Sequence, residues 1–318
     1  MRNLFTSLCL LVAMVPLPVF SRDVHIVVTG LGGDEEYTER FAQALNLLTS
    51  AYAPGSADET STDDQPAVEV LALDAEQSSR QALIELFDSV AANTTADDFV
   101  SVTLIGHGTY DGEHYKFNVS GEDLTGADLK TGLQKLPAQR QLVVVATSAS
   151  GVLLKTLEQA GRILVTATKS GGETNVVVFP VHWADALSTS AADRDRNEIV
   201  TVAEAFRYAE TQVENHYAEQ GLLASEHARL EGDNPAARSL VRIGALRNAA
   251  GNVKVEQLLD ERLVLQQELD KLLARKADLA RDQYYSELEQ LMLRMARIQL
   301  SIDDETGWSQ DQSNGRGS

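Results

Sequence analysis

The sequence predicts an α/β protein with a doubly wound, mainly parallel sheet, followed by a long C-terminal helical extension. Over the first two thirds of the chain, short β-branched and apolar runs alternate with helical patterns. This alternation is typical of parallel strands with helices packed on both faces of the sheet. Residues 253–302 then contain neither glycine nor proline and repeat leucine at helical spacing, which predicts the extension.

The first 21 residues have the pattern of a signal peptide. A positive start at Arg2 is followed by an apolar core over residues 4–14, two prolines and a small-residue cleavage site ending at Ser21. The apolar run is too short to span a bilayer, although an uncleaved anchor is the alternative. Cleavage would remove Cys9, the only cysteine, and leave no thiol nucleophile. We therefore expect a periplasmic or secreted protein without an integral membrane segment after signal removal.

An α/β domain is expected over residues 22–234, because six apolar, β-branched runs have the length of buried strands. These runs are Val24–Thr29, Val68–Leu73, Phe99–Ile105, Leu142–Ala146, Arg162–Thr168 and Asn175–Val181. Residues 53–65 form an acidic, small-residue loop, and residues 109–122 a small hairpin or lid. A glycine-rich turn at residues 30–33 lacks the last glycine of a dinucleotide fingerprint, so we expect a tight turn without a cofactor.

Helices are expected between these strands where apolar residues recur every three to four positions. The first has Phe41, Leu45 and Leu48 on one face, and another opens at Thr125 with Asp128 in a capping box. The expected ranges are 36–50, 78–93, 125–136, 152–159, 183–192 and a long helix from about 204 to about 231.

The helical extension is expected over residues 235–305, before a disordered tail at 306–318. Its apolar residues are interleaved with Glu, Arg and Lys, as in coiled coils. It is either one helix of about 50 residues, roughly 75 Å long, or a helical hairpin. Its apolar stripe predicts burial by self-association, giving a homo-oligomer, or by another partner. The alternative is a hairpin folded back onto the α/β domain.

Two strand ends carry the candidate chemistry. The run Thr103–Gly108 delivers His107, and the run Leu142–Gly151 delivers Ser148. Ligands of parallel sheets collect at the carboxyl ends of the strands. Acyl transfer by a side-chain nucleophile requires at least a nucleophile and a neighbouring base such as an imidazole. We expect the Ser148 hydroxyl to lie within about 3–4 Å of His107, or one water away.

These strand ends resemble the legumain-like and caspase-like cysteine peptidases. In that clan a His-Gly step supplies the base, and a cysteine, often followed by x-Ser-Gly, supplies the nucleophile. The resemblance spans about residues 24–231 and places His107 on the base and Ser148 on the nucleophile. The surrounding binding positions are Gly106, Gly108, Ser150 and Gly151. Serine at position 148 is the essential departure from the family pattern.

The serine in place of the catalytic cysteine limits which functions can be expected. A serine hydroxyl is far less acidic than a thiol and usually needs an orienting group for the base and a prepared oxyanion hole. Asp111 is near enough in sequence to orient His107. The leading interpretation is a pseudopeptidase that binds a protein or peptide partner. The alternatives are a hydrolase using Ser148 with His107, and an assembly protein for which the α/β domain is a platform.

A calcium loop is the other candidate site. Asp193, Asp195, Asn197 and Glu204 occupy positions 1, 3, 5 and 12 of such a loop, and an apolar residue fills position 8. Glu198 takes the sixth position, where glycine normally permits the turn. The alternative is an acidic loop that caps a helix.

The charge balance excludes one class of partner. The chain has 27 basic and 47 acidic residues, and no basic cluster forms a face for a polyanion. We expect no nucleic-acid binding.

Overall fold

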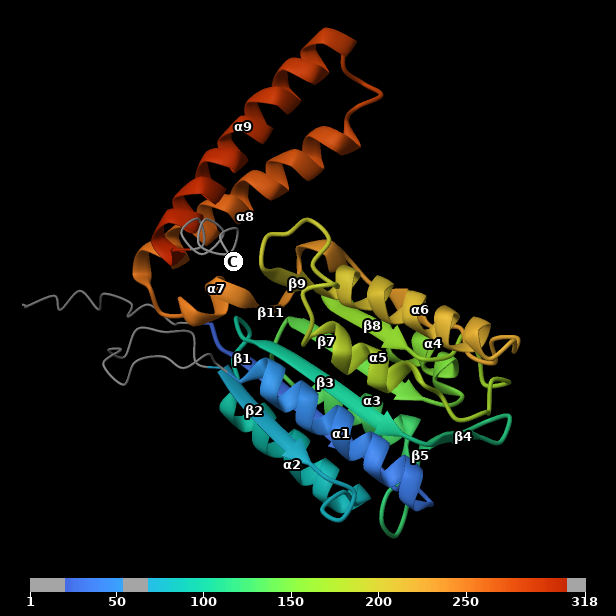
Figure 1. Ribbon diagram of the computed structural model, residues 1–318. Coiled ribbons are helices and arrows are strands. Elements are labelled where there is room, and N and C mark those ends of the chain that lie inside the picture. Colours follow the sequence, from blue (N-terminus) through green and yellow to red (C-terminus); the bar gives the residue numbers. More distant parts are fainter. Residues whose placement is uncertain (1–20, 54–67, 308–318) are drawn as a thin grey trace, which may run out of the picture.

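The structure, a computed structural model, describes residues 21–53 and 68–307 (Figure 1). The predicted signal peptide up to residue 20, nearly all of the acidic loop at 53–65 and the tail from residue 308 lie outside the described residues. Within the described ranges, no helix has both the length and the apolar character needed to cross a membrane.

A six-stranded sheet forms the centre of the fold, in the order β10–β8–β7–β3–β1–β2. Five neighbouring strands run parallel, and β10 pairs antiparallel with β8 at one edge. The predicted α/β class with a mainly parallel sheet is confirmed. The strands are β1 (Asp23–Thr29), β2 (Val68–Leu73), β3 (Phe99–Gly106), β7 (Arg140–Thr147), β8 (Arg162–Thr166) and β10 (Arg229–Glu231).

Helices cover both faces of this sheet, and each face has its own apolar core. One core is built with α1 (Glu35–Tyr52), α5 (Phe179–Ala186) and α6 (Val202–Glu219). The other is built with α2 (Arg80–Asn93), α3 (Gly126–Lys135) and α4 (Leu153–Leu157), which a 3-10 turn at Ser150–Val152 precedes. The predicted capping box of Thr125 and Asp128 opens α3.

The predicted sixth strand at residues 175–181 is wrong. Residues 179–186 form α5 instead, and Pro180 stands in its first turn, where a fixed φ and a missing N–H are tolerated. The buried Glu226 carboxylate accepts hydrogen bonds from the amides of Val178 and Phe179, at 2.8 and 3.2 Å. These bonds stabilise a helix start within an apolar run that resembles a strand. The predicted helix at 183–192 therefore begins and ends earlier in the chain.

The predicted long helix to about residue 231 is also wrong at its end. Helix α6 stops at Glu219, and Gly221 turns the chain with a φ of 66°. The residues that follow lead into β10, which supplies the sixth strand of the sheet.

Two small sheets flank the main one. The segment after β3 forms β4 (Gly108–Tyr110), β5 (Tyr115–Phe117) and β6 (Leu124–Thr125), which confirms a predicted hairpin there. Farther along, β9 (Ile199–Thr201) pairs with β11 (Ser239–Arg242), and a 3-10 turn at Pro235–Ala237 precedes β11.

The C-terminal region is a hairpin of two antiparallel helices, not one long helix. The short α7 (Gly244–Asn248) leads into α8 (Val253–Ala274), and α9 (Arg281–Thr306) returns beside it. Figure 1 shows this hairpin projecting away from the α/β domain, with the α8–α9 turn at its far end. It does not fold back onto the sheet and its helices.

Candidate functional site

The carboxyl ends of β3 and β7 bring the two predicted catalytic residues to neighbouring positions. The strands pair in parallel, with Gly106 opposite Thr147. His107 and Ser148 each come directly after one member of this pair, at the same edge of the sheet. The sequence prediction that they end neighbouring strands is therefore confirmed.

The His107 ring is held by contacts on the α1 side of the sheet. Its Nε2 atom lies 2.8 Å from the carbonyl oxygen of Gly32. Because a carbonyl only accepts, this nitrogen carries the proton, and the free lone pair of the ring is on Nδ1. The rings of Tyr37 and Phe41 meet the imidazole edge-on, with centroids 5.4 and 5.3 Å away.

Gly108 explains how closely the two strand ends approach each other. A Cβ atom at this position would lie 2.4 Å from the Ser148 carbonyl oxygen and 2.7 Å from the Thr147 hydroxyl oxygen. No side chain fits there. Ser148 itself is 2% exposed, so its hydroxyl lies in a largely enclosed space between the strand ends.

The turn after Ser148 is strained and strongly anchored. Ala149 has a left-handed backbone, with a φ of 54°, a conformation that costs a non-glycine residue about 1–3 kcal/mol. Its amide donates to the carbonyl oxygen of Glu173 at 2.8 Å. The amide of Gly151 donates to the Thr168 hydroxyl at 3.0 Å. Two amides that follow the candidate nucleophile are thus engaged within the fold.

Ser150 and Gly151 act in packing at this turn. The Ser150 hydroxyl, fully buried, pairs with the Thr168 hydroxyl at 3.1 Å and accepts from the Thr168 amide. A Cβ atom on Gly151 would lie 2.2 Å from the carbonyl carbon of Lys169. Both residues hold the segment after β8 against the turn. Gly106 has a φ of 153° and packs against the Phe117 ring.

The side chains of His107 and Ser148 are not directly coupled. In the described part of the chain, no hydrogen bond within 3.5 Å joins them. The His107 Nε2 atom is engaged by the Gly32 carbonyl, and Nδ1 accepts no hydrogen bond there. Asp111 accepts hydrogen bonds from the amides of Glu113 and His114, within its own turn. It makes no hydrogen bond to His107.

A charged cluster beside this turn was not predicted from the sequence. Glu173, mostly buried, pairs with His227 at 2.5 Å and with Lys169 at 3.2 Å. Burial alone would raise the pKa of Glu173, but hydrogen bonds from Lys169 and His227 lower it overall. Lys169 and Glu173 stand four positions apart, but His227 lies 54 positions beyond Glu173, and no spacing in the sequence marks it as their neighbour.

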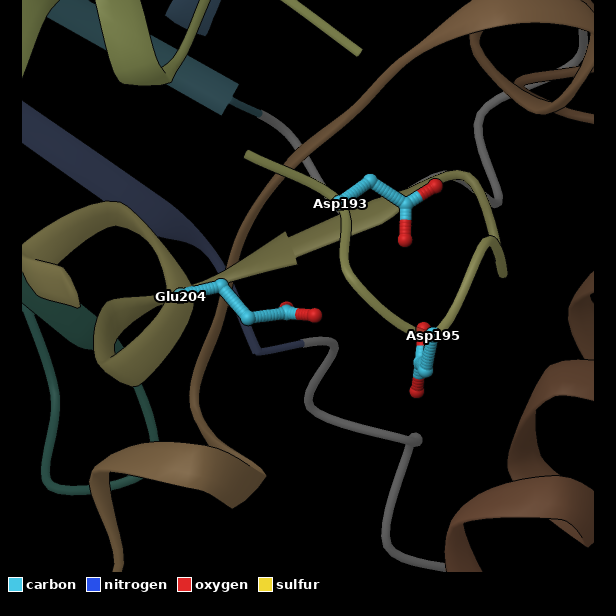
Figure 2. A group of neighbouring side chains, drawn as sticks. All are labelled: Asp193, Asp195 and Glu204. Atoms are coloured by element: carbon cyan, nitrogen blue, oxygen red, sulfur yellow. The ribbon is translucent and has the colours of Figure 1, made fainter. Parts of the chain in front are cut away.

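The predicted calcium loop brings its carboxylates together. Asp193, Asp195 and Glu204 each offer an oxygen within 4.8 Å of the others, and Figure 2 shows the three side chains around a common space. Asp193 also accepts from the amides of Asn197 and Glu198, at 3.1 and 2.8 Å. Asn197 is turned inward on the loop: its side-chain amide donates to Asp195 at 2.8 Å.

Electrostatic crowding is the main property of this loop. Loss of solvation raises the pKa of Asp195 to about 6, and the negative charges of Glu204 and Asp193 add to the shift. The Arg262 guanidinium on α8 is near enough to oppose it. A cation among these oxygens would relieve the repulsion between carboxylates. Glu204 has a second role, because it completes the capping box that opens α6 with Thr201.

Glu198 shows why the sixth loop position is not glycine. Its backbone is left-handed, with a φ of 60°, as this position of a calcium loop demands. Its carboxylate accepts from the amides of Ala245 and Leu246, at 3.3 and 2.7 Å, in the first turn of α7. The side chain therefore ties the loop to the start of the C-terminal region, a role that the sequence did not indicate.

Comparison with known proteins adds little to these observations. No protein-family model matches the chain, and no curated protein matches it. Among solved structures, the chain is similar to protein GSU0716 from Geobacter sulfurreducens, with a TM-score of 0.43 and 8% sequence identity. That match covers 71% of this chain and 97% of the other. Similarity at this level supports no argument about function.

Proposed function

We propose that this protein is an exported, legumain-like or caspase-like domain that binds a protein or peptide partner without hydrolysing it. The observation that carries the proposal is that His107 and Ser148 end neighbouring strands and yet, among the described residues, no hydrogen bond joins their side chains. Nε2 is held by the Gly32 carbonyl, and the free lone pair on Nδ1 accepts no hydrogen bond from Ser148 in the described part of the chain.

The surroundings of Ser148 support the same conclusion. A serine nucleophile needs a base that accepts its proton and donors already aimed at the developing oxyanion. The amides of Ala149 and Gly151 donate to groups of the fold. We infer the position of the site from the resemblance to the peptidase clan. We infer the loss of activity from the chemistry of Ser148 and its neighbours.

Fluorophosphonate labelling tests the proposal. The native protein should show neither adduct formation at Ser148 nor cleavage of peptides after Asn or Asp. Ser148→Ala is the matched control, because it removes one oxygen at a buried position. Stoichiometric modification at Ser148, absent from Ser148→Ala and from His107→Ala, would contradict the proposal.

A serine hydrolase is the alternative function, and one observation favours it. The pairing of Gly106 with Thr147 places His107 and Ser148 at the ends of adjacent strands. Rotation of the His107 ring on substrate binding would then bring a ring nitrogen to the serine. Labelling that depends on His107 is the result expected of this alternative.

Calcium is the proposed structural ion of the domain. The support is the agreement of two observations: the spacing of the loop in the sequence, and the convergence of Asp193, Asp195 and Glu204 in the structure. An ion bound only by the folded state raises the melting temperature with its concentration. Asp193→Ala with Glu204→Gln should abolish the rise, and Glu210→Gln, farther along α6, should retain it. A melting temperature that does not respond to millimolar calcium would exclude the site.

A further inference from the structure

The hairpin of α8 and α9 uses one face of each helix to hold itself together. Lys254 pairs with Glu305 near the base, and Arg294 with Glu268 at 3.1 Å farther out. The buried residues of α9 are Ile302, between these two pairs, and Tyr284, nearer the α8–α9 turn. Partly buried apolar residues lie on the same side of the helix between them, at alternating steps of four and three residues. These are Leu288, Leu291, Met295 and Ile298. The inner face of α9 is therefore complete within the hairpin.

A second apolar stripe on α9 remains uncovered. Tyr285, Met292 and Leu293 are each 51% exposed, and Leu300 is 64% exposed. Steps of seven and eight residues keep these side chains on one helix face, away from the face that contacts α8. The stripe is about 22 Å long, since 15 residues rise about 1.5 Å each. Of the eleven large hydrophobic residues exposed in the described part of the chain, eight belong to the hairpin.

The order of residues in the stripe is symmetric along the helix. Tyr285 precedes the central pair Met292–Leu293 by seven residues, and Leu300 follows it by seven. If two such helices pack antiparallel, the apolar residues of one lie opposite apolar residues of the other. The aromatic end of each stripe then faces the aliphatic end of its partner. We propose that the α9 stripe binds the α9 stripe of a second copy of this chain, antiparallel, about a two-fold axis at Met292 and Leu293. Tyr285 then packs on the partner's Leu300.

Charged residues on and beside the stripe fit the same register. Arg281, Glu289, Arg297 and Asp304 are exposed, and no ion pair holds any of them among the described residues. In this register, Arg281 lies opposite the partner's Asp304, and Glu289 lies beside the partner's Arg297. Because the dimer has two-fold symmetry, each of these ion pairs forms twice in the interface. Asp282 meets the partner's Asp303, a like-charge contact that the neighbouring Arg281 offsets.

The distribution of charge also favours the antiparallel arrangement over a parallel one. The hairpin at residues 253–306 holds 12 of the 47 acidic residues and 8 of the 27 basic residues. The α/β domain at its base is thus the more strongly acidic part. Antiparallel hairpins place the two acidic domains at opposite ends of the contact, whereas parallel hairpins bring them side by side.

Sedimentation of the full chain tests the interface. The native protein should be a dimer at micromolar concentration. Met292→Glu with Leu293→Glu should weaken dimerisation by about 100-fold or more, because each substitution acts on both sides of the two-fold axis. The matched control is Gln290→Glu with Ser301→Glu, which adds the same charge on an exposed face of α9 outside the stripe and should leave the dimer intact. A monomeric native protein, or a dimer that survives the first pair of substitutions, would overturn the proposal.

Charge reversal and cross-linking test the register. Arg281→Asp and Asp304→Arg should each weaken the dimer, and their combination should restore it. In a Cys9→Ser background, Leu293→Cys should cross-link to itself. Leu300→Cys should cross-link only when mixed with Tyr285→Cys. Self-cross-linking of Leu300→Cys would indicate parallel helices and overturn the antiparallel assignment. A dimer that is weaker with both charge reversals than with either one alone would also overturn it.

Discussion

The buried histidine of β1 gives a quantitative prediction about stability and pH. His25 is 2% exposed, its Nδ1 lies 2.7 Å from the Ser101 hydroxyl, and its ring stacks on Tyr52 at 3.9 Å. Burial lowers the pKa of His25 from 6.5 to about 3. The folded state therefore binds fewer protons than the unfolded state, and its stability is complete above about pH 6.5 and falls as the pH drops towards 3.

The size of this loss follows from the shift. Each pH unit below the unfolded pKa costs about 1.4 kcal/mol while the folded histidine stays neutral. At pH 4.5 the loss is about 3 kcal/mol, a large part of the stability of an ordinary domain. His25→Phe with Ser101→Ala removes both members of this hydrogen bond, so neither is left without the other, and it preserves an aromatic ring beside Tyr52.

Urea unfolding of both proteins from pH 7.5 to pH 4.5 isolates the histidine, because the carboxylates are common to the two. The native protein should lose about 3 kcal/mol more than the double variant over this range. Equal losses in the two proteins would refute the reasoning, since they would show that His25 is not held neutral by burial.

Three further predictions concern the sites. Gly108→Ala should lower the free energy of unfolding by about 2–4 kcal/mol in urea titrations, because its Cβ would meet the Ser148 carbonyl oxygen at 2.4 Å; a change below about 0.5 kcal/mol would show that the strand ends can separate. Glu198→Ala should speed hydrogen exchange of the Ala245 and Leu246 amides, which lose their acceptor, and unchanged exchange would contradict this capping role. Calcium should raise the melting temperature more at pH 7.5 than at pH 5, because the raised pKa of Asp195 leaves that ligand protonated below about 6; an equal rise at both values would exclude Asp195 as a ligand.

The strands and most helices could be predicted because their patterns are local. Four of the five parallel strands, β1, β3, β7 and β8, are almost entirely buried and therefore read as continuous apolar, β-branched runs, whereas β2 at the sheet edge is only partly buried. The capping box of Thr125 and Asp128 is equally local, since its two partners stand three residues apart. The hairpin α8–α9 has no glycine or proline at its turn, so the sequence left two arrangements open.

The errors arose where distant residues decide the local structure. Residues 175–181 look like a strand, but Glu226, about 50 positions later, caps the start of α5. Glu198 looks unsuitable for a calcium loop until its contact with α7 is known. For the strand ends, the sequence predicted which residues end neighbouring strands. The orientation of the His107 ring depends on the Gly32 carbonyl, 75 positions away, and no local pattern encodes it.

The protonation of the His107 ring is the most direct test of the proposed loss of catalysis. Long-range proton–nitrogen NMR of the imidazole, assigned by comparison with His107→Gln, distinguishes the two tautomers. The predicted result is a proton on Nε2, hydrogen-bonded to Gly32, together with an Nδ1 nitrogen that accepts no hydrogen bond. A hydrogen bond from the Ser148 hydroxyl to either ring nitrogen would contradict the account and identify the pair as a working base and nucleophile.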